Sequence, residues 1–546
     1  MWHTRYPQKV IEKQVRPFQF SYNSIITLTK DEILVVDPLS PTPIIPKSEI
    51  PSEPVVPTHR LSKSRFLAGL QCHKRLYLEI HSPELATPPT PDRRAIMDMG
   101  TDVGVLAREF FPGGVLVEET HRQIPAALTR TTELVADPTV SAIFEGAFVW
   151  QGILVRVDVI ERLDATRWRL IEVKATSKVK ATHLDDMAIQ SAVLEGAGLV
   201  VDDCYLMHLN TQYVFLGGDL NLEEMFALDN MTDEVQARRL LVQSQLEDMW
   251  EVLQKPTPPM MAPDGHCYQP YECPFWDHCT KEKSPRWVFY LPGSSKLQKV
   301  LRQEGVETID DIPTHIPLSD IQQRVKGNVE WISPLLRARL QGVRYPVHHL
   351  DFETFMPAIP VFANTRPYRP IPFQWSNHIE YEDGTVVHHH YLCVDGRDPR
   401  EELAQNLLGS LGESGSVCVY SEYERFLLFA LGDFLPHLKP ALSKVVRRLW
   451  DLLSVIQQHY YHPDFRGSYS IKTVLPALVP ALAYNDLTIQ NGAVAAVMYQ
   501  KMVFSETDLM ERAHIAQALE EYCGRDTWAM VELRRVLMGR VGGLFL

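Results

Sequence analysis

The chain has 546 residues, enough for two to four domains, and its 45% hydrophobic and 22% charged residues are typical of globular protein. No apolar run reaches 18 residues, which excludes a membrane-spanning helix at the level of sequence. The first residues lack the apolar core of a signal peptide, so we expect a cytoplasmic protein with no membrane partner. The net charge of −14 lacks the basic excess typical of nucleic-acid-binding proteins.

Residues 1–57 are predicted to be an N-terminal extension. A short β unit is expected over residues 1–37, and the seven prolines of residues 38–57 predict a semi-rigid linker. The pattern assigns no function to this region.

The next segment, Leu61–Leu78, contains Cys72 and two basic groups, Lys63–Arg65 and Lys74–Arg75. These basic side chains either contact phosphate or form a solvated helix face. Further on, Gly100–Gly104 is expected to precede a helical run that ends at Pro112.

Residues 152–174 form two β-rich runs separated by the polar stretch Asp164–Arg167, which predicts a hairpin. A turn centred near Ala165 places Asp158 directly opposite Glu172, with Cβ atoms about 4.5–5.5 Å apart. The period of two puts Lys174 on the same face as Glu172. Two carboxylates and an ammonium group on one sheet face predict a cation site, with an exposed hairpin carrying a salt bridge as the alternative.

An acid followed by Glu-x-Lys on the next strand resembles the PD-(D/E)xK nuclease signature in its RecB-like form. The resemblance implies that Asp158 and Glu172 bind Mg²⁺ or Mn²⁺ and that Lys174 orients the attacking water. It also implies that Gln190, in a helix expected to open at Asp186, braces the site and contacts substrate. Where many relatives have a histidine ligand, this chain has Gly104, so the site is expected to lack it.

Three of the eight cysteines fall in one short loop, as Cys267, Cys273 and Cys279, and Cys72 lies far upstream. One early and three late cysteines around a RecB-like core resemble the iron–sulfur nucleases, which include the CRISPR-associated RecB-family exonucleases and the nuclease domain of AddAB. The resemblance implies a [4Fe–4S] cluster that joins the two ends of the domain. Structural zinc is the alternative, with His266 or His278 as a possible substitute ligand. The other four cysteines are expected to be buried thiols.

Residues 286–342 predict a helical connector with one helix over 294–305 and a second that begins at Thr308 and ends before Pro313. The connector is expected to be a spacer, with weak contact to a DNA backbone as the alternative.

A second constellation begins near residue 343. The strand His348–Glu353 ends in alternate acids, so Asp351 and Glu353 share one face. It is followed by a strand from Phe373, a turn at Asp383–Gly384, and a strand from Val386 to Val394, which predicts a three-stranded meander.

Later acids complete this pattern. Glu424 follows a strand that enters a helix, and Asp451 is a second candidate for the same role. Tyr522 and Asp526 have the i, i+4 spacing that puts both on one helix face. The set resembles the tyrosine subtype of the DEDD 3′–5′ exonucleases, which have a ribonuclease H-like fold. It implies that Asp351, Glu353, Asp526 and either Glu424 or Asp451 hold two metal ions, while Tyr522 positions water.

Two further segments carry groups suited to a nucleic acid. Lys472, in Gly467–Pro476, is a candidate phosphate contact, although a helix N-cap at Ser468 or Ser470 explains the same hydroxyls. Arg366 and Arg369 flank an aromatic residue, types that bind strands by charge and stacking.

We therefore expect an α/β protein with an extension (1–57), a restriction-endonuclease-like PD-(D/E)xK domain (58–285), a helical connector (286–342) and a ribonuclease H-like domain (343–546). Over residues 58–546 the arrangement resembles an uncharacterised bacterial two-domain family. The expected function is metal-dependent, exonucleolytic hydrolysis of DNA phosphodiester bonds, in DNA repair or defence against mobile elements, with RNA as a possible substrate. A non-catalytic scaffold and an RNA exonuclease that uses only the C-terminal domain are the alternatives.

Overall fold

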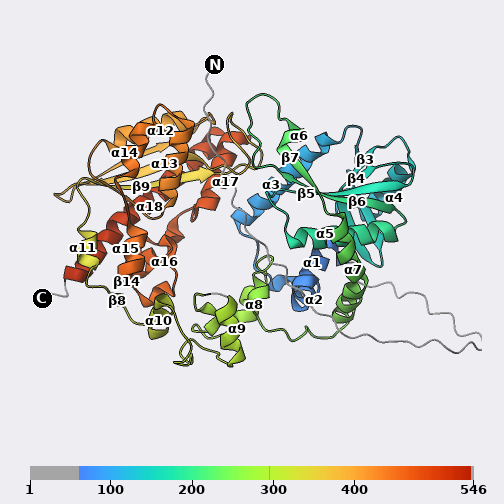
Figure 1. The fold of residues 1–546 in the computed structure, drawn as a ribbon, viewed down its shortest axis with the longest axis horizontal. Coiled ribbons are helices and arrows are strands. Elements are labelled where there is room, and N and C mark those ends of the chain that lie inside the picture. The colour runs from blue at the N-terminus through green and yellow to red at the C-terminus, as the bar shows by residue number, and fades with distance from the viewer. Residues whose placement is uncertain (1–60, 294, 543–546) are drawn as a thin grey trace, which may run out of the picture. The chain divides into compact units, whose positions relative to one another are not determined.

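A computed structural model describes residues 61–293 and 295–542, so the expected β unit and proline-rich linker lie outside the described residues. The described chain is a mixed α/β protein with two mixed β-sheets and helices around them (Figure 1). Within these residues, no helix combines the length and apolar character that a membrane span requires.

The first sheet has seven strands in the order β2-β3-β4-β5-β6-β7, with β1 paired to β4. Its strands are β1 (Leu61–Ser62), β2 (Val115–Leu116), β3 (Ala142–Trp150), β4 (Ile153–Arg162), β5 (Arg167–Lys174), β6 (Val200–Leu209) and β7 (Phe226–Asn230). Its helices are α1 (Lys63–Gln71), α2 (His73–His81), α3 (Pro91–Ala107), α4 (Ile124–Ala136), α5 (Ala181–Gly196), α6 (Leu222–Met225), α7 (Thr232–Leu253) and α8 (Trp276–Thr280).

The predicted hairpin is the β4–β5 pair. Along β5, Trp168 and Leu170 pack into one hydrophobic cluster with α5, whereas Ile171 and Val173 pack on the opposite face with α3. This alternation is the period of two that the sequence displays. Glu172 therefore lies on the face that α5 covers, and its side chain is fully buried.

Two sequence predictions about helix ends in this half are wrong. Gly100 and Gly104 lie inside α3 instead of before a helix, and a Cβ at either position would meet no atom within 4 Å, so neither glycine marks a close contact. Helix α5 begins at Ala181, five residues before Asp186, where the backbone N–H of Lys180 donates to His183 Nδ1 at 3.3 Å.

The connector contains α9 (Ser295–Gln303), α10 (Asp320–Gly327), β8 (Trp331–Ile332) and α11 (Leu336–Leu340). The first predicted helix is confirmed, but the one expected from Thr308 is wrong. Thr308 pairs with Trp287 in an isolated antiparallel bridge, which holds Thr308 extended. The next helix is α10, which begins after the capping box formed by Ser319 and Gln322. Ile309 and Ile312 are buried in the C-terminal core, so the connector is not a plain spacer.

The second sheet has five strands in the order β11-β10-β9-β12-β13. They are β9 (Val347–Phe355), β10 (Ile371–Glu380), β11 (Val386–Leu392), β12 (Ser416–Val419) and β13 (Leu449–Asp451). The first three form the predicted antiparallel meander, and β12 and β13 add in parallel. A short β14 (Tyr460–Tyr461) pairs with β8.

Seven helices surround this sheet. They are α12 (Arg400–Leu411), α13 (Tyr423–Phe434), α14 (Lys439–Val446), α15 (Leu452–His459), α16 (Ile471–Leu478), α17 (Gly492–Phe504) and α18 (Leu509–Gly542). Helices α17 and α18 pack against β9. This packing brings Tyr522 and Asp526 of α18 to the strand that carries Asp351 and Glu353.

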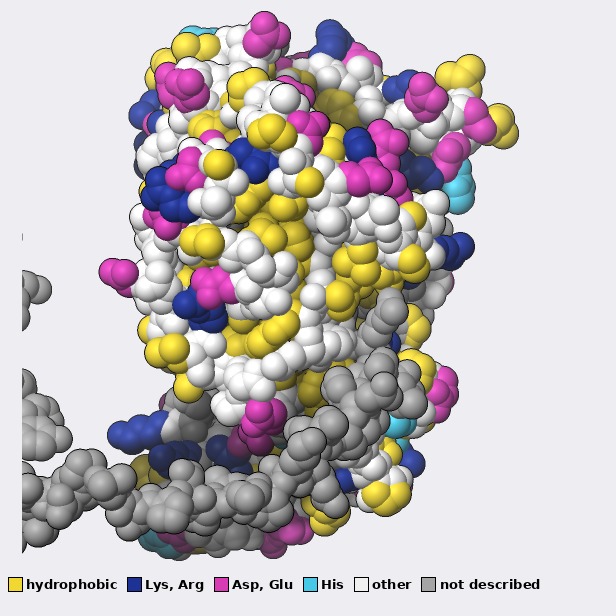
Figure 2. All heavy atoms as spheres, turned by 90° about the vertical axis from the view of Figure 1, so that its right-hand side faces the viewer, with side chains coloured by type: hydrophobic (Ala, Val, Ile, Leu, Met, Phe, Trp, Pro, Cys, Tyr) yellow, Lys and Arg dark blue, Asp and Glu magenta, His cyan; other side chains and the backbone are white. Residues whose placement is uncertain are grey.

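The surface in Figure 2 carries basic side chains scattered among acidic and hydrophobic ones. On the described part of this face, Lys and Arg do not gather into one patch, in keeping with the net charge of −14. On this face, binding of nucleic acid would have to rest on local features instead of a broad basic patch.

Two candidate active sites

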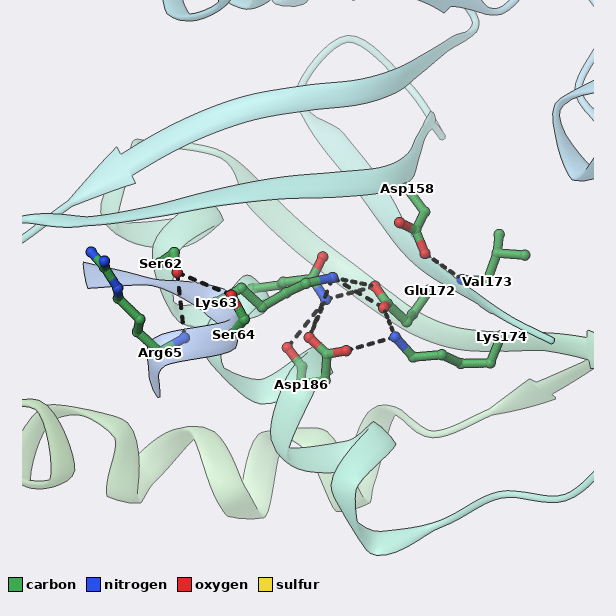
Figure 3. A network of polar contacts seen from close by, with 10 residues as sticks. Ser62, Lys63, Ser64, Arg65, Asp158, Glu172, Val173, Lys174 and Asp186 are labelled. Atoms are coloured by element: carbon green, nitrogen blue, oxygen red, sulfur yellow. Dashed lines mark hydrogen bonds and ion pairs between the residues drawn. The ribbon is translucent and has the colours of Figure 1, made fainter. Parts of the chain in front are cut away.

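The N-terminal site forms where β4 and β5 separate. Their ladder runs from Arg162–Trp168 to Val159–Ile171, so Asp158 and Glu172 occupy the next register position, as predicted. The ladder ends there because the Asp158 carboxylate accepts the Val173 backbone N–H, at 2.8 Å. Figure 3 shows that the two carboxylates point to different partners: Asp158 to Val173, Glu172 to the lysines.

Two ammonium groups occupy the centre of this site (Figure 3). Lys63 Nζ lies 3.1 Å from Glu172 Oε1 and 3.4 Å from Asp186 Oδ1. Lys174 Nζ contacts Glu172 Oε1 and lies 2.7 Å from Asp186 Oδ2. Lys174 is therefore on the Glu172 face, as the alternation predicts, while Lys63 and Asp186 join the site from α1 and α5.

Gln190 braces the site. Its Nε2 donates to Glu172 Oε2 at 2.6 Å and to Asp186 Oδ1 at 3.2 Å. Because the side chain is fully buried, it supports the acids and contributes no surface for substrate in this conformation. Both Glu172 oxygens thus have partners within the protein.

The electrostatics follow from these contacts. Burial and the neighbouring Glu172 raise the pKa of Asp158 to about 7. Burial would also raise the pKa of Glu172, but the ammonium groups of Lys174 and Lys63 hold it well below its usual value. Burial and Glu172 raise the pKa of Asp186. Three carboxylates and two ammonium groups leave little charge for a metal to neutralise.

The C-terminal site begins with the two acids of β9. Ligand atoms of Asp351, Glu353 and the buried Cys523 lie within 4.8 Å of one another. Glu353 is only 5% exposed, and the cation whose charge acts on its carboxylate is Lys472, which forms its own ion pair with Asp526. The group is therefore rich in ligand atoms and poor in internal donors.

Asp526 of α18 completes the acid set. Lys472 Nζ donates to Asp526 Oδ1 at 3.0 Å, and the hydroxyl of Tyr484 donates to the same oxygen. The Lys472 ammonium lies 3.2 Å from the centre of the Tyr484 ring and 4.4 Å from that of Tyr522. Ser470 is the N-cap residue of α16 but makes no side-chain cap bond, and Lys472 in the first turn of this helix reaches Asp526.

Glu424 and Asp451 were the two candidates for the third acid. Glu424 lines a pocket of about 460 Å³ together with Asp351, Lys472, Tyr522 and Asp526. Asp451 instead accepts a hydrogen bond from Ser454 and, by its charge, helps to raise the pKa of Glu424. The structure brings Glu424 to the pocket wall.

The acids of this pocket repel one another. Burial, Asp526, Glu353 and Glu424 raise the pKa of Asp351 well above its usual value, and burial and Asp526 do the same for Glu353. Burial raises the pKa of Glu424 to about 7. Lys472 is the one ammonium group among the described pocket residues, and burial lowers its pKa.

The four predicted cysteine ligands line one small pocket. Cys72 lies between α1 and α2, and the other three come from residues 267–279. Gln71 ties the two segments together, since its Nε2 donates to the backbone oxygens of His266 (2.7 Å) and Tyr271 (2.6 Å). His266 also lines the pocket.

Sequence reasoning missed several members of these sites. The sequence predicts Lys63 to be a phosphate contact or part of a solvated helix face, and Asp186 to be a helix start, although the i, i+4 spacing of Asp186 to Gln190 is a usable signal. Tyr484 lies in an irregular segment 42 residues from its partner Asp526, and no local pattern marks it.

Comparisons with known proteins cover parts of the chain. Residues 348–470 match the family described as "Domain of unknown function (DUF2779)", a stretch that includes Asp351, Glu353 and Glu424. The chain is similar to "Uncharacterized protein UU173" of Ureaplasma parvum, with 25% identity over 207 residues. This match covers 34% of the chain and 30% of that relative, so it spans less than a third of the relative's length.

Among solved structures, the chain is similar to the one titled "Crystal structure of SSO0001", with 15% identity and a TM-score of 0.19. The match covers 38% of this chain and 81% of that one.

Proposed function

We propose that the protein is a metal-dependent nuclease that hydrolyses phosphodiester bonds, with its main active site in the C-terminal half. The observation that carries this proposal is the excess of buried carboxylates around the pocket of Asp351, Glu424 and Asp526. Such carboxylates raise one another's pKa and are stable as anions only when a cation joins them.

The ligand set fits hard divalent cations. Carboxylate oxygens are the ligands that Mg²⁺ and Mn²⁺ prefer. Asp351, Glu353 and Asp526 would hold the metal, with Glu424 on the facing wall of the pocket. When bound, a pair of such ions lowers the pKa of water and stabilises the charge that develops on a phosphodiester.

The chain's own residues have distinct tasks in this proposal. Tyr522 presents its ring to the pocket and would orient the attacking water through its hydroxyl. Lys472, held by Asp526 at 3.0 Å, places a positive charge beside the phosphate. Tyr484 fixes the Asp526 carboxylate. This assignment follows the resemblance to the DEDD exonucleases, and the meander followed by parallel strands supports a ribonuclease H-like fold.

The N-terminal site is proposed to be a PD-(D/E)xK centre of RecB-like type that acts on DNA. Its support is the shared position of Asp158, Glu172 and Lys174 at one point of the sheet. Lys63 and Lys174 both contact Oε1 of Glu172 and Gln190 donates to Oε2, so a metal ion at Glu172 would compete with two ammonium groups for this carboxylate. We therefore assign it the smaller part of the activity.

The cysteine pocket is proposed to hold a [4Fe–4S] cluster that joins the early and late segments of the N-terminal half. Among the described residues, no three of the four sulfurs lie within 4.8 Å of one another. A tetrahedral zinc site, with bonds of about 2.3 Å, would bring sulfurs to about 3.8 Å. The wider spacing favours the cluster, and iron and zinc analysis of purified wild type and Cys72→Ser separates the two.

The test of the function is cleavage of end-labelled single-stranded DNA, duplex DNA and RNA with Mn²⁺. Asp351→Asn is expected to remove most activity, at least a thousandfold, because metal-ligand loss abolishes stabilisation of the developing charge. Asp158→Asn is expected to have a smaller effect, confined to DNA. Glu413→Gln, an exposed change in the same half as Asp351, is the control.

The alternatives give different results in the same assay. RNA cleavage that exceeds DNA cleavage and survives Asp158→Asn identifies an RNA exonuclease that uses the C-terminal half. Strand binding without cleavage in any metal identifies a scaffold and overturns the proposal.

A further inference from the structure

We propose that a groove beside the C-terminal site binds an unpaired stretch of nucleic acid a few nucleotides from the bond that is cleaved. The groove lies between helix α13 and residues 364–372, and we call it the α13 groove. The identity of its ligand as a strand rests on the proposed function, whereas the groove itself is a feature of the described structure.

One face of helix α13 is aromatic, and two of its rings, Phe426 and Phe429, line the α13 groove. Tyr423, Phe426 and Phe429 are 39%, 45% and 48% exposed, and their spacing of three residues puts them on one face of the helix. The opposite face of the helix is buried in the core through Leu427, Leu428 and Leu431. Large aromatic side chains that gather on a solvent face mark a binding surface more often than isolated exposed ones.

The groove has room for a ligand of nucleotide size. Phe426 and Phe429 line a pocket of about 690 Å³, within the range of small-molecule sites. Its other wall is formed by Arg366, Arg369 and the start of β10. Apolar rings therefore face guanidinium groups across one space.

The charge of the groove is positive. Two of its charged residues are already neutralised, since Arg400 pairs with Asp398 at 2.5 Å and Asp433 pairs with Lys439 at 2.7 Å. Arg366 donates to the neutral side chain of Gln212. Neither Arg366 nor the exposed Arg369 has an ion-pair partner among the described residues, so both remain available to an anion.

The α13 groove and the acidic pocket both lie against helix α13, with different residues of the helix lining each. The Tyr423 hydroxyl lies 2.8 Å from Thr354 Oγ1, and Thr354 directly follows Glu353. On the other face of the same helix, Glu424 lines the acidic pocket. From Tyr423 to Phe429 the helix rises about 9 Å, a length that one to three nucleotides can span.

These features select a nucleic-acid strand over a protein segment. Stacking on aromatic rings together with phosphate contacts to arginine is how proteins hold single strands without reading their sequence. The neighbouring acids, which are proposed to hydrolyse phosphodiesters, require a strand to be delivered to them. A protein segment would use the aromatic wall but has no general need for the two unpaired arginines.

The experiment measures binding and chemistry separately. Binding of fluorescent single-stranded oligonucleotides is followed by anisotropy in EDTA, where no cleavage occurs. Hydrolysis of the nitrophenyl ester of thymidine monophosphate by the Asp158→Asn variant in Mn²⁺ reports the acidic pocket without the groove, because this substrate is too short to reach the groove.

Phe426→Ala/Phe429→Ala is expected to weaken oligonucleotide binding at least tenfold and to leave ester hydrolysis unchanged. Arg369→Glu is expected to weaken binding and to lower the slope of log affinity against log salt by about one ion. The matched controls are Tyr381→Ala, an aromatic residue 43% exposed at the opposite end of β10, and Arg337→Glu, an exposed arginine on α11.

The outcomes distinguish this inference from the proposed function. The proposal that the α13 groove binds a strand is wrong if oligonucleotide affinity is unchanged in both groove variants, or if the control variants reduce it equally. Weaker binding in the groove variants with no ester hydrolysis in wild type supports the groove and contradicts the nuclease proposal. Circular dichroism of each variant shows whether the fold is retained.

Discussion

In the N-terminal site three carboxylates face two ammonium groups, whereas the C-terminal site has four carboxylates around one lysine. Both sites arise from acids that share one face of a sheet, on two strands in the first site and on one strand in the second, and both match a nuclease pattern at the level of sequence. They differ in what the rest of the fold adds to them. Lys63 reaches the first site from a distant helix and takes the place that a cation would use.

The comparison shows that an acidic motif predicts which side chains could bind a metal ion, but not how much negative charge the fold leaves for that ion to neutralise. That remaining charge depends on how many lysine or arginine side chains contact the acids and on how deeply the acids are buried. In the first site the ammonium groups lower the pKa of Glu172, and in the second the carboxylates raise the pKa of Asp351. The predictions below test this difference, from the largest expected effect to the smallest.

Lys63→Met is expected to destabilise the metal-free N-terminal half by about 3–5 kcal/mol, because it leaves the buried Glu172 with one ammonium group fewer. Hydrogen exchange of peptides from β5 and α5 measures the effect locally. Lys178→Met, an exposed change nearby, is the control. Added Mn²⁺ should restore protection in Lys63→Met more than in wild type, and equal behaviour of the two lysine variants would show that Lys63 does not balance the site.

Mn²⁺ at a hundred times its dissociation constant is expected to stabilise the C-terminal half by about 2.7 kcal/mol. Thermal melts with and without metal measure this, and titration calorimetry gives the dissociation constant. The stabilisation should vanish in Asp526→Asn and persist in Asp158→Asn. The reverse pattern would place the stronger metal site in the N-terminal half.

The metal-free protein is expected to lose stability as the pH rises through about 7. Burial raises the pKa of Glu424 from 4.5 to about 7, so the folded protein binds a proton that the unfolded chain releases in this range. Glu424→Gln should therefore be more stable than wild type by about 3 kcal/mol at pH 8 and similar to it near pH 4.5. Unfolding curves at a series of pH values test this, and parallel profiles would contradict it.

Tyr522→Phe is expected to lower the rate of Mn²⁺-dependent cleavage about tenfold while strand affinity stays the same, because the hydroxyl orients water and the ring remains. Single-turnover kinetics separate the two quantities. A loss of affinity without a change in rate would make Tyr522 a substrate contact instead.

Much of both sites could be predicted because it depends on local periodicity. The period of two placed Glu172 with Lys174, and the helical spacing placed Tyr522 with Asp526. Even the register opposite Asp158 followed from the position of the turn.

The rest depends on packing between distant segments. Lys63 lies 109 residues from Glu172 and Lys472 lies 54 from Asp526, so no window of sequence shows these pairs together. The helix expected at Thr308 failed for the same reason, since its partner Trp287 lies outside any local pattern.

The connector has a practical consequence for work on the C-terminal half alone. Val288, Leu301, Leu336 and Leu340 are interior residues of the same apolar cluster that receives Leu533 and Leu537 of the last helix. A truncated protein that starts at residue 343 would lack the connector residues of this cluster, expose the apolar side chains that they cover and be prone to self-association. A protein that starts near residue 285 keeps these side chains buried.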